Sequence, residues 1–217
     1  MPVPAPSTGR LVPATAPSTA SRRAPSAASL ALLGAAALLL AANAPARAEV
    51  VAVASDHAAV RQAAHVHEQP QRVWKLLTNE IGHWWSPAHT WSGEAKNLSL
   101  EARPGGCLCE KLPDGGARHL EVVYAEPPVT LRLAGALGPL QELALTGAMT
   151  WTLAPVGEGC DVTVTYRLAG HAEGESGLAE WAPLVDRVLG EQVERLRRYV
   201  ETGSPEAPAR APAQPEP

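Results

Sequence analysis

The feature that most constrains the fold is a long run of apolar residues at helical spacing near the carboxyl end of the chain. At 3.6 residues per turn its large side chains fall on one stripe: Leu178, Trp181, Val185, Val188, Leu189, Val193, Leu196, Tyr199 and Val200. The opposite face is charged, with Glu191 and Arg195, and Glu194 and Arg198, at the favoured i,i+4 spacing. A helix this long and one-sided requires a wide apolar surface to pack against.

The ends of this helix also have sequence signals. Ser176 is the expected N-cap, and Gly203 is the expected stop at the C-terminus. Gln192 falls on the apolar stripe, where its amide needs a polar partner or a polar cavity.

The central part of the chain has a period of two, which is typical of strands with one buried face. The clearest alternation runs over residues 143–153 and 162–168. Turn-forming segments separate the strands: Pro104-Gly105-Gly106, Asp114-Gly115-Gly116, Glu126-Pro127-Pro128 and Gly157-Glu158-Gly159. With a strand over 60–68 and a short helix from Pro70 to Gly82, the predicted order is strand, short helix, about six antiparallel strands and long helix. The sheet supplies the surface that the long helix requires.

This element order resembles the helix-grip fold of the START-like, or SRPBCC, superfamily, which includes polyketide cyclases and the chaperone-ATPase-activator homology group. The resemblance covers residues 60–202, and segments such as Ile81-Gly82-His83-Trp84-Trp85 are similar to those of uncharacterised secreted bacterial members. It implies an α+β domain in which a curved antiparallel sheet of about seven strands wraps around the C-terminal helix and encloses an apolar cavity. No short catalytic signature defines the superfamily, so the resemblance identifies no catalytic residue.

The first 48 residues have the composition of an export signal. Residues 1–29 are rich in Pro, Ala and Ser and contain arginine but no acidic residue, residues 30–42 are apolar, and Ala46-Arg47-Ala48 is a small-x-small cleavage site. We therefore predict a signal peptide over 1–48, cleavage after Ala48, and a periplasmic or secreted protein. The alternative is a transmembrane anchor, because residues 24–46 are uncharged and long enough to span a bilayer, although only mildly apolar.

The rest of the chain divides into a lead-in over 49–58, a folded domain over 59–202 and a Pro-rich tail over 203–217 with the composition of a disordered segment. After cleavage the chain carries 14 basic and 22 acidic residues, a net charge of −8. An acidic protein without a basic cluster is a poor candidate for binding nucleic acid or anionic membranes. We expect no stable membrane insertion once the leader is removed.

Candidate site residues lie in the loop after the short helix and on the inner face of the sheet. His83, His89, Cys107, Cys109 and His119 lack the paired spacing of a zinc site, so no metal or other cofactor is predicted. The predicted cavity-lining residues are Trp84, Trp85, His89, Trp91, Glu110, Tyr124, Met149, Trp151, Tyr166 and Gln192. Two interpretations of this set are open. The tryptophans form a cavity entrance or a satellite hydrophobic cluster, and the polar groups orient a ligand or satisfy one another.

Strand parity gives two further expectations. Cys107 and Cys109 are predicted to stay unbridged, because i and i+2 on an extended strand lie about 6.5 Å apart in Cα, near the limit for a disulfide. His119 has the opposite parity from Leu120 and is expected to face solvent, which argues against its use in an acid–base pair with a glutamate.

These observations favour a non-enzymatic carrier or sensor that binds a small hydrophobic molecule between the sheet and the C-terminal helix. One alternative is a cavity enzyme of the polyketide cyclase or hydrolase kind. The other is a protein-interaction module, which follows if Met149, Trp151 and Tyr166 fill the interior completely.

Overall fold

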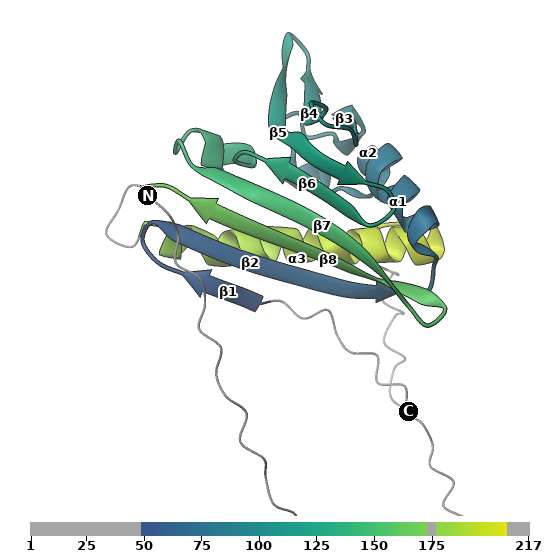
Figure 1. Ribbon diagram of the computed structural model, residues 1–217. Coiled ribbons are helices and arrows are strands. Elements are labelled where there is room, and N and C mark those ends of the chain that lie inside the picture. Colours follow the sequence, from purple (N-terminus) through teal and green to yellow (C-terminus); the bar gives the residue numbers. More distant parts are fainter. Residues whose placement is uncertain (1–48, 173–176, 208–217) are drawn as a thin grey trace, which may run out of the picture. The chain divides into compact units, whose positions relative to one another are not determined.

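The computed structural model describes residues 49–172 and 177–207. Within these ranges, eight antiparallel strands form one sheet in the order β1-β2-β8-β7-β6-β5-β4-β3 (Figure 1). The strands are β1 (Glu49–Val53), β2 (His57–Val66), β3 (Leu98–Leu100), β4 (Cys107–Leu112), β5 (Gly115–Glu126), β6 (Thr130–Ala134), β7 (Thr146–Val156) and β8 (Gly159–Ala169). The α-helices are α1 (Pro70–Asn79), α2 (Ile81–Trp84) and α3 (Leu178–Thr202), and short 3-10 turns are η1 (Pro87–His89), η2 (Ala95–Asn97) and η3 (Gly138–Gln141).

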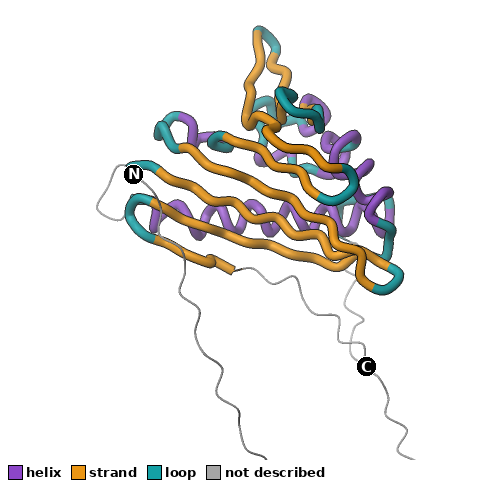
Figure 2. Tube along the Cα trace, viewed as in Figure 1, coloured by secondary structure: helices purple, strands orange, loops and turns teal. Residues whose placement is uncertain are grey.

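This arrangement confirms the helix-grip prediction, since a curved open antiparallel sheet packs against a long C-terminal helix. Figure 2 shows α3 running along one face of the strands, where it contacts β1, β2 and β8. The six strands predicted after residue 98 are present as β3 to β8. The segment 49–58, predicted as a lead-in to the domain, forms the edge strand β1 and the start of β2. The described sheet therefore has eight strands rather than about seven.

Helix α3 has the predicted apolar stripe, with Leu189 and Leu196 buried against the core. Its N-cap is Gly177, and the predicted cap at position 176 lies outside the described residues. Gly177 has φ +52°, and a Cβ there would collide with the carbonyl of Ser55, which accepts a hydrogen bond from Leu178 N. This contact fixes the start of α3 beneath the β1–β2 turn. The helix ends as predicted at Gly203, in the left-handed conformation.

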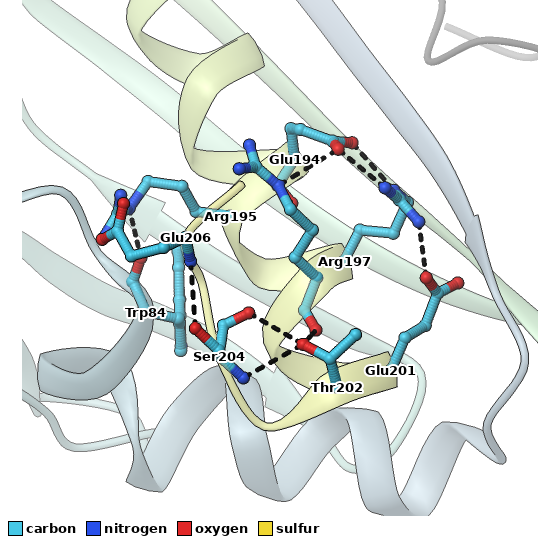
Figure 3. Close-up of polar contacts among 9 residues, drawn as sticks. Trp84, Glu194, Arg195, Arg197, Glu201, Thr202, Ser204 and Glu206 are labelled. Atoms are coloured by element: carbon cyan, nitrogen blue, oxygen red, sulfur yellow. Dashed lines mark hydrogen bonds and ion pairs between the residues drawn. The ribbon is translucent and has the colours of Figure 1, made fainter. Parts of the chain in front are cut away.

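Arg195 was expected on the exposed, charged face of α3, but the structure places it elsewhere. It is buried, and its Nε donates to the Trp84 carbonyl oxygen at 2.9 Å while Nη2 pairs with Glu206 at 2.9 Å (Figure 3). The guanidinium therefore links α3 to the end of α2 and to the segment after the helix. Of the tail predicted over 203–217, residues 203–207 are described and include Glu206 of this contact, whereas 208–217 lie outside the described residues.

The outer face of α3 carries charge pairs near its C-terminus (Figure 3). Glu194 pairs with Arg197 at 2.7 Å and with Arg198 at 3.2 Å, so the predicted i,i+4 pair of Glu194 is present. Glu191 instead pairs with His89 at 2.9 Å, across to the loop after α2. One predicted helix-surface pair is thus replaced by a contact between two elements.

A bulge between β4 and β5 corrects the expectation for His119. Leu108 pairs with Leu120 and Cys109 pairs with Arg118, which leaves His119 as an extra residue in β5. An extra residue interrupts the alternation of faces, so His119 and Leu120 are both buried. Parity counted from the sequence fails at this point.

The same region contradicts the prediction for the cysteines, because Cys107 and Cys109 form a disulfide. The β4 register shifts between Leu108 and Cys109, and the two Cα atoms lie 5.4 Å apart, closer than on a regular extended strand. That distance is within the range that a disulfide spans. Cys160 is buried as a free thiol.

A second irregularity, between β5 and β6, places Tyr124 on the outside. Val122 pairs with Leu133 and Tyr124 pairs with Arg132, so the residue between them in β5 is unpaired. Tyr124 is 42% exposed and donates to Glu126 Oε2 at 2.7 Å. Its predicted place on the cavity wall is therefore wrong.

Candidate functional site

A cavity of about 540 Å³ lies between the sheet, the first half of α3 and two loops, 85–91 and 137–142. The sheet contributes Leu98, Leu108, His119 and Tyr166. The loops contribute Trp85, Ala88, His89, Thr90, Trp91, Leu137, Gly138, Pro139, Leu140 and Glu142. Helix α3 contributes Trp181, Leu184, Val185, Val188 and Leu189. Most of these side chains are apolar, so the wall favours an apolar guest.

The apolar stripe of α3 has two parts with different roles. Its first half, from Trp181 to Leu189, lines the cavity. Its second half, with Val193, Leu196 and Val200, is buried in the hydrophobic core. One continuous helical pattern therefore supplies both the cavity wall and the core that supports it.

Two polar contacts, at Ser86 and at His89, hold the loop 85–91 against α3. Gln192 Oε1 accepts a hydrogen bond from Ser86 N at 2.8 Å, which gives the amide on the apolar stripe a buried partner. His89 Nε2 lies 2.9 Å from Glu191 Oε2, and Trp85 Nε1 donates to the His89 carbonyl at 3.1 Å. These contacts position the rings of Trp85 and His89 at the cavity wall.

The second loop is held by Tyr166, which projects from β8. Its hydroxyl donates to the Gly135 carbonyl at 3.0 Å and accepts from Leu137 N at 3.0 Å. The side chain is fully buried, and this burial raises the pKa of Tyr166 well above its usual range, although the hydrogen bond from Leu137 acts in the opposite direction. Tyr166 is therefore a neutral phenol whose two hydrogen bonds are used by the protein.

The most polar feature of the site is a buried pair formed by Glu110 on β4 and His119 on β5. Glu110 accepts hydrogen bonds from Trp91 N at 3.0 Å, Ser92 N at 2.6 Å and His119 Nε2 at 2.9 Å. Burial by itself would raise the pKa of Glu110, but hydrogen bonds from Ser92, Trp91 and His119 outweigh it and hold the pKa below its usual value. Glu110 is thus an ionised carboxylate that accepts three hydrogen bonds.

His119 carries a nitrogen that the protein leaves unsatisfied. The ring lies in the cavity wall, and its Nδ1 is buried without a hydrogen-bond partner among the described residues. Most buried polar atoms in folded proteins have a partner, so an unpaired one at a cavity requires an explanation.

The predicted cavity residues fall into three groups. Trp85, His89, Trp91 and Tyr166 line the cavity. Glu110 and Gln192 are buried beside it, where they hold the loop 85–92 in place.

The remaining predictions lie away from the wall. Trp84, Met149 and Trp151 belong to the hydrophobic core, with the Trp84 and Trp151 rings 6.2 Å apart, and Tyr124 is on the outer surface. Trp85 and Trp91 thus line the cavity, whereas Trp84 belongs to the main hydrophobic core and not to a separate cluster under the loop. His119 is absent from the predicted set, because the only sequence signal for its orientation is strand parity and the bulge reverses it.

The fold and the cavity together define a helix-grip domain with an internal apolar chamber. The chain belongs to the family described as "Polyketide cyclase / dehydrase and lipid transport", which it matches over residues 57–201. This membership confirms the START-like, or SRPBCC, resemblance. No curated protein matches the chain.

Several solved structures are similar to this fold. A conserved protein of unknown function from Enterococcus faecalis has 12% identity and a TM-score of 0.48, with 79% of this chain and 83% of that chain covered. CalU16 from Micromonospora echinospora has 16% identity and a TM-score of 0.48, covering 69% and 78%. DynU16, a putative protein in the dynemicin biosynthetic locus, has 24% identity and a TM-score of 0.48, covering 68% of this chain and 48% of its own. The present chain thus spans about half of DynU16.

Over residues 49–172 and 177–207, no helix combines the length and the apolarity that a membrane span needs.

Proposed function

We propose that this protein binds a small hydrophobic molecule in the cavity between the sheet and α3. The observation that carries the proposal is the cavity itself, about 540 Å³ in volume and lined mainly by apolar and aromatic side chains. Ligand sites in proteins commonly occupy about 300 to 1,000 Å³ and combine such walls with a few polar groups. The description of the family, which includes lipid transport, supports the same function.

The cavity also weighs against a pure interaction module with a filled core. Met149, Trp151 and Tyr166 are all buried, as that alternative requires, yet space for a guest remains beside them. Trp91 and Leu184 line this space and are 49% and 43% exposed, so they connect it with solvent. We propose that the ligand enters at this exposed part of the wall.

A pair of matched substitutions tests this function. Val188 on α3 lines the cavity, so Val188→Trp fills part of it and is expected to weaken ligand binding at least about tenfold. Val123 is 47% exposed on β5, so Val123→Trp makes the same chemical change away from the cavity and should leave binding unchanged. Native mass spectrometry identifies a ligand that co-purifies, and calorimetry with fused aromatic compounds and medium-chain fatty acids measures affinity. The proposal fails if the wild type binds none of them, or if both variants bind equally well.

The Glu110–His119 pair favours a second candidate, a cavity enzyme. A carboxylate that fixes one nitrogen of an imidazole in a cavity wall, while the other nitrogen has no partner, is similar to the arrangement of a general base. The family description includes cyclases and dehydrases, whose reactions involve proton removal. Under this candidate a compound bound by the wild type is converted, and His119→Phe abolishes the conversion while the compound still binds. If the compound binds to the wild type but is not converted, the enzyme candidate fails and the carrier function remains.

A further inference from the structure

His119 Nδ1 is the one buried side-chain polar atom without a hydrogen-bond partner in the part of the chain that the structure describes. The Tyr166 hydroxyl is engaged with Gly135 and Leu137, and His89 Nε2 is engaged with Glu191. His119 Nδ1 is buried and has none within the described part of the chain. Leaving a buried polar atom unpaired destabilises a protein. A ligand that pairs with this atom recovers that free energy as binding affinity.

The neighbouring carboxylate determines which kind of ligand group fits. Ionised Glu110 can only accept hydrogen bonds, so the nitrogen that faces it at 2.9 Å, Nε2 of His119, carries the proton. In the neutral imidazole the other nitrogen, Nδ1, then has a free lone pair. The wall therefore presents a hydrogen-bond acceptor, and the complementary ligand group is a donor.

We propose that His119 Nδ1 binds a hydroxyl group of the ligand, and that the ligand is a hydroxylated aromatic molecule. The aromatic part is inferred from Trp85, Trp91 and Trp181, whose rings line the same cavity. A phenolic hydroxyl is a strong donor and matches a buried acceptor in a mainly apolar wall. This inference rests on the proposed function and specifies the class of guest.

We expect Trp91 to be the wall residue that moves when such a group approaches the nitrogen. Nδ1 is covered by the wall, so a neighbouring side chain must move before a guest contacts it. The backbone N–H of Trp91 is held by Glu110, whereas the Trp91 side chain is 49% exposed. Its ring can therefore move while the Glu110–His119 pair stays in place.

Two probes that differ only in the donor test the proposal. 1-Naphthol carries a phenolic hydroxyl, and 1-methoxynaphthalene has the same ring system without the donor. We expect calorimetry to show that the wild type binds the naphthol about tenfold more tightly than the ether. In His119→Phe this preference should fall to about twofold or less, because the acceptor is gone. His67→Phe, at an exposed position on the chain after β2, is the matched control and should keep the wild-type preference.

Nitrogen-15 NMR of the His119 ring provides a measurement that does not depend on a variant. The free protein at neutral pH should have a protonated Nε2 and an unprotonated Nδ1, and the Nδ1 signal should shift with 1-naphthol but stay in place with the ether. Equal affinities for the two probes in the wild type, or a proton on Nδ1 of the free protein, overturn this inference and leave the proposed cavity function intact. If the wild type binds neither probe, the inference fails together with the proposed binding of aromatic guests.

Discussion

The chemistry of the cavity wall depends on the orientation of one side chain, that of His119. In a regular strand His119 and Leu120 would face opposite sides of the sheet, and the imidazole would point to water. The β-bulge turns both residues inward, where Glu110 receives the imidazole N–H. β-Bulges frequently re-aim a side chain near a functional site. The local irregularity therefore creates the polar point in an apolar wall.

The ionised state of Glu110 makes stability depend on pH in a defined direction. Its pKa in the folded protein lies below the ordinary value of 4.5, so the stabilisation is present above pH 4.5 and is lost as the pH falls through the folded-state pKa.

Glu110→Gln is expected to lower the free energy of unfolding by about 1 to 3 kcal/mol at neutral pH. Denaturant titrations should show this difference shrinking below pH 4.5. Glu158→Gln, in the exposed β7–β8 turn, should differ little from the wild type at any pH. A difference for Glu110→Gln that grows in acid contradicts the assignment.

The cysteines give a second prediction for individual residues. Denatured protein should contain one reactive thiol per chain before reduction and three after it, because Cys107 and Cys109 are bridged and Cys160 is free. In the native protein Cys160 should resist labelling, since burial and the nearby Asp161 raise its pKa to about 11. Thiol titration with mass spectrometry measures both counts. Rapid labelling of the native protein, or three thiols without reduction, would show that this description is incorrect.

Helix α3 joins a supporting half to a cavity-lining half. Near its C-terminus, Leu196 and Val193 are almost completely buried in the core. Nearer its N-terminus, Val185 and Leu189 are also buried, but they face the cavity. A substitution in the supporting half should therefore affect stability most, whereas one in the cavity-lining half should affect the shape of the guest that fits.

Two alanine substitutions on α3 test this division. Leu196 is 1% exposed, so Leu196→Ala should lower the free energy of unfolding by about 2 to 5 kcal/mol through lost apolar contact and a residual cavity. Arg187 is exposed on the same helix, and Arg187→Ala should change stability by about 0.5 kcal/mol or less. Thermal and denaturant unfolding measure both. Equal shifts in the two variants would mean that the buried face of α3 is wrongly assigned.

At the scale of the whole molecule, periodicity was sufficient to predict the architecture. The 3.6-residue stripe predicts α3, and alternation with turn residues predicts the six strands from residue 98 onwards, because each pattern depends only on neighbours in the chain. It did not predict edge strand β1, which is defined by its pairing with β2.

Several of the errors at single residues have a physical cause in contacts between distant parts of the chain. His119, Tyr124 and the Cys107–Cys109 pair all lie where strand registers shift, and a shift depends on the partner strand rather than on local sequence. The helical spacing of Arg195 predicts the charged face of α3. Its buried partner, the Trp84 carbonyl, is distant in the chain and is not visible in that spacing. Residue type and spacing thus predict the sheet, α3 and the loop 85–91 as parts of the cavity, but not the loop 137–142. Pairing between strands decides which side chains of the sheet enter the wall.

Export is a prediction for the whole chain, and we propose that the mature protein begins at Glu49. Cleavage after Ala48 would leave β1, which starts at Glu49, complete. Ala48→Trp places a bulky side chain where the signal requires a small one, so it should block processing. Arg47→Gln changes the middle position of the same site and should be processed normally. Intact mass measurement of the exported protein from the native host checks all three forms. Wild-type protein that stays in the membrane with residues 30–48 attached would instead support the transmembrane anchor.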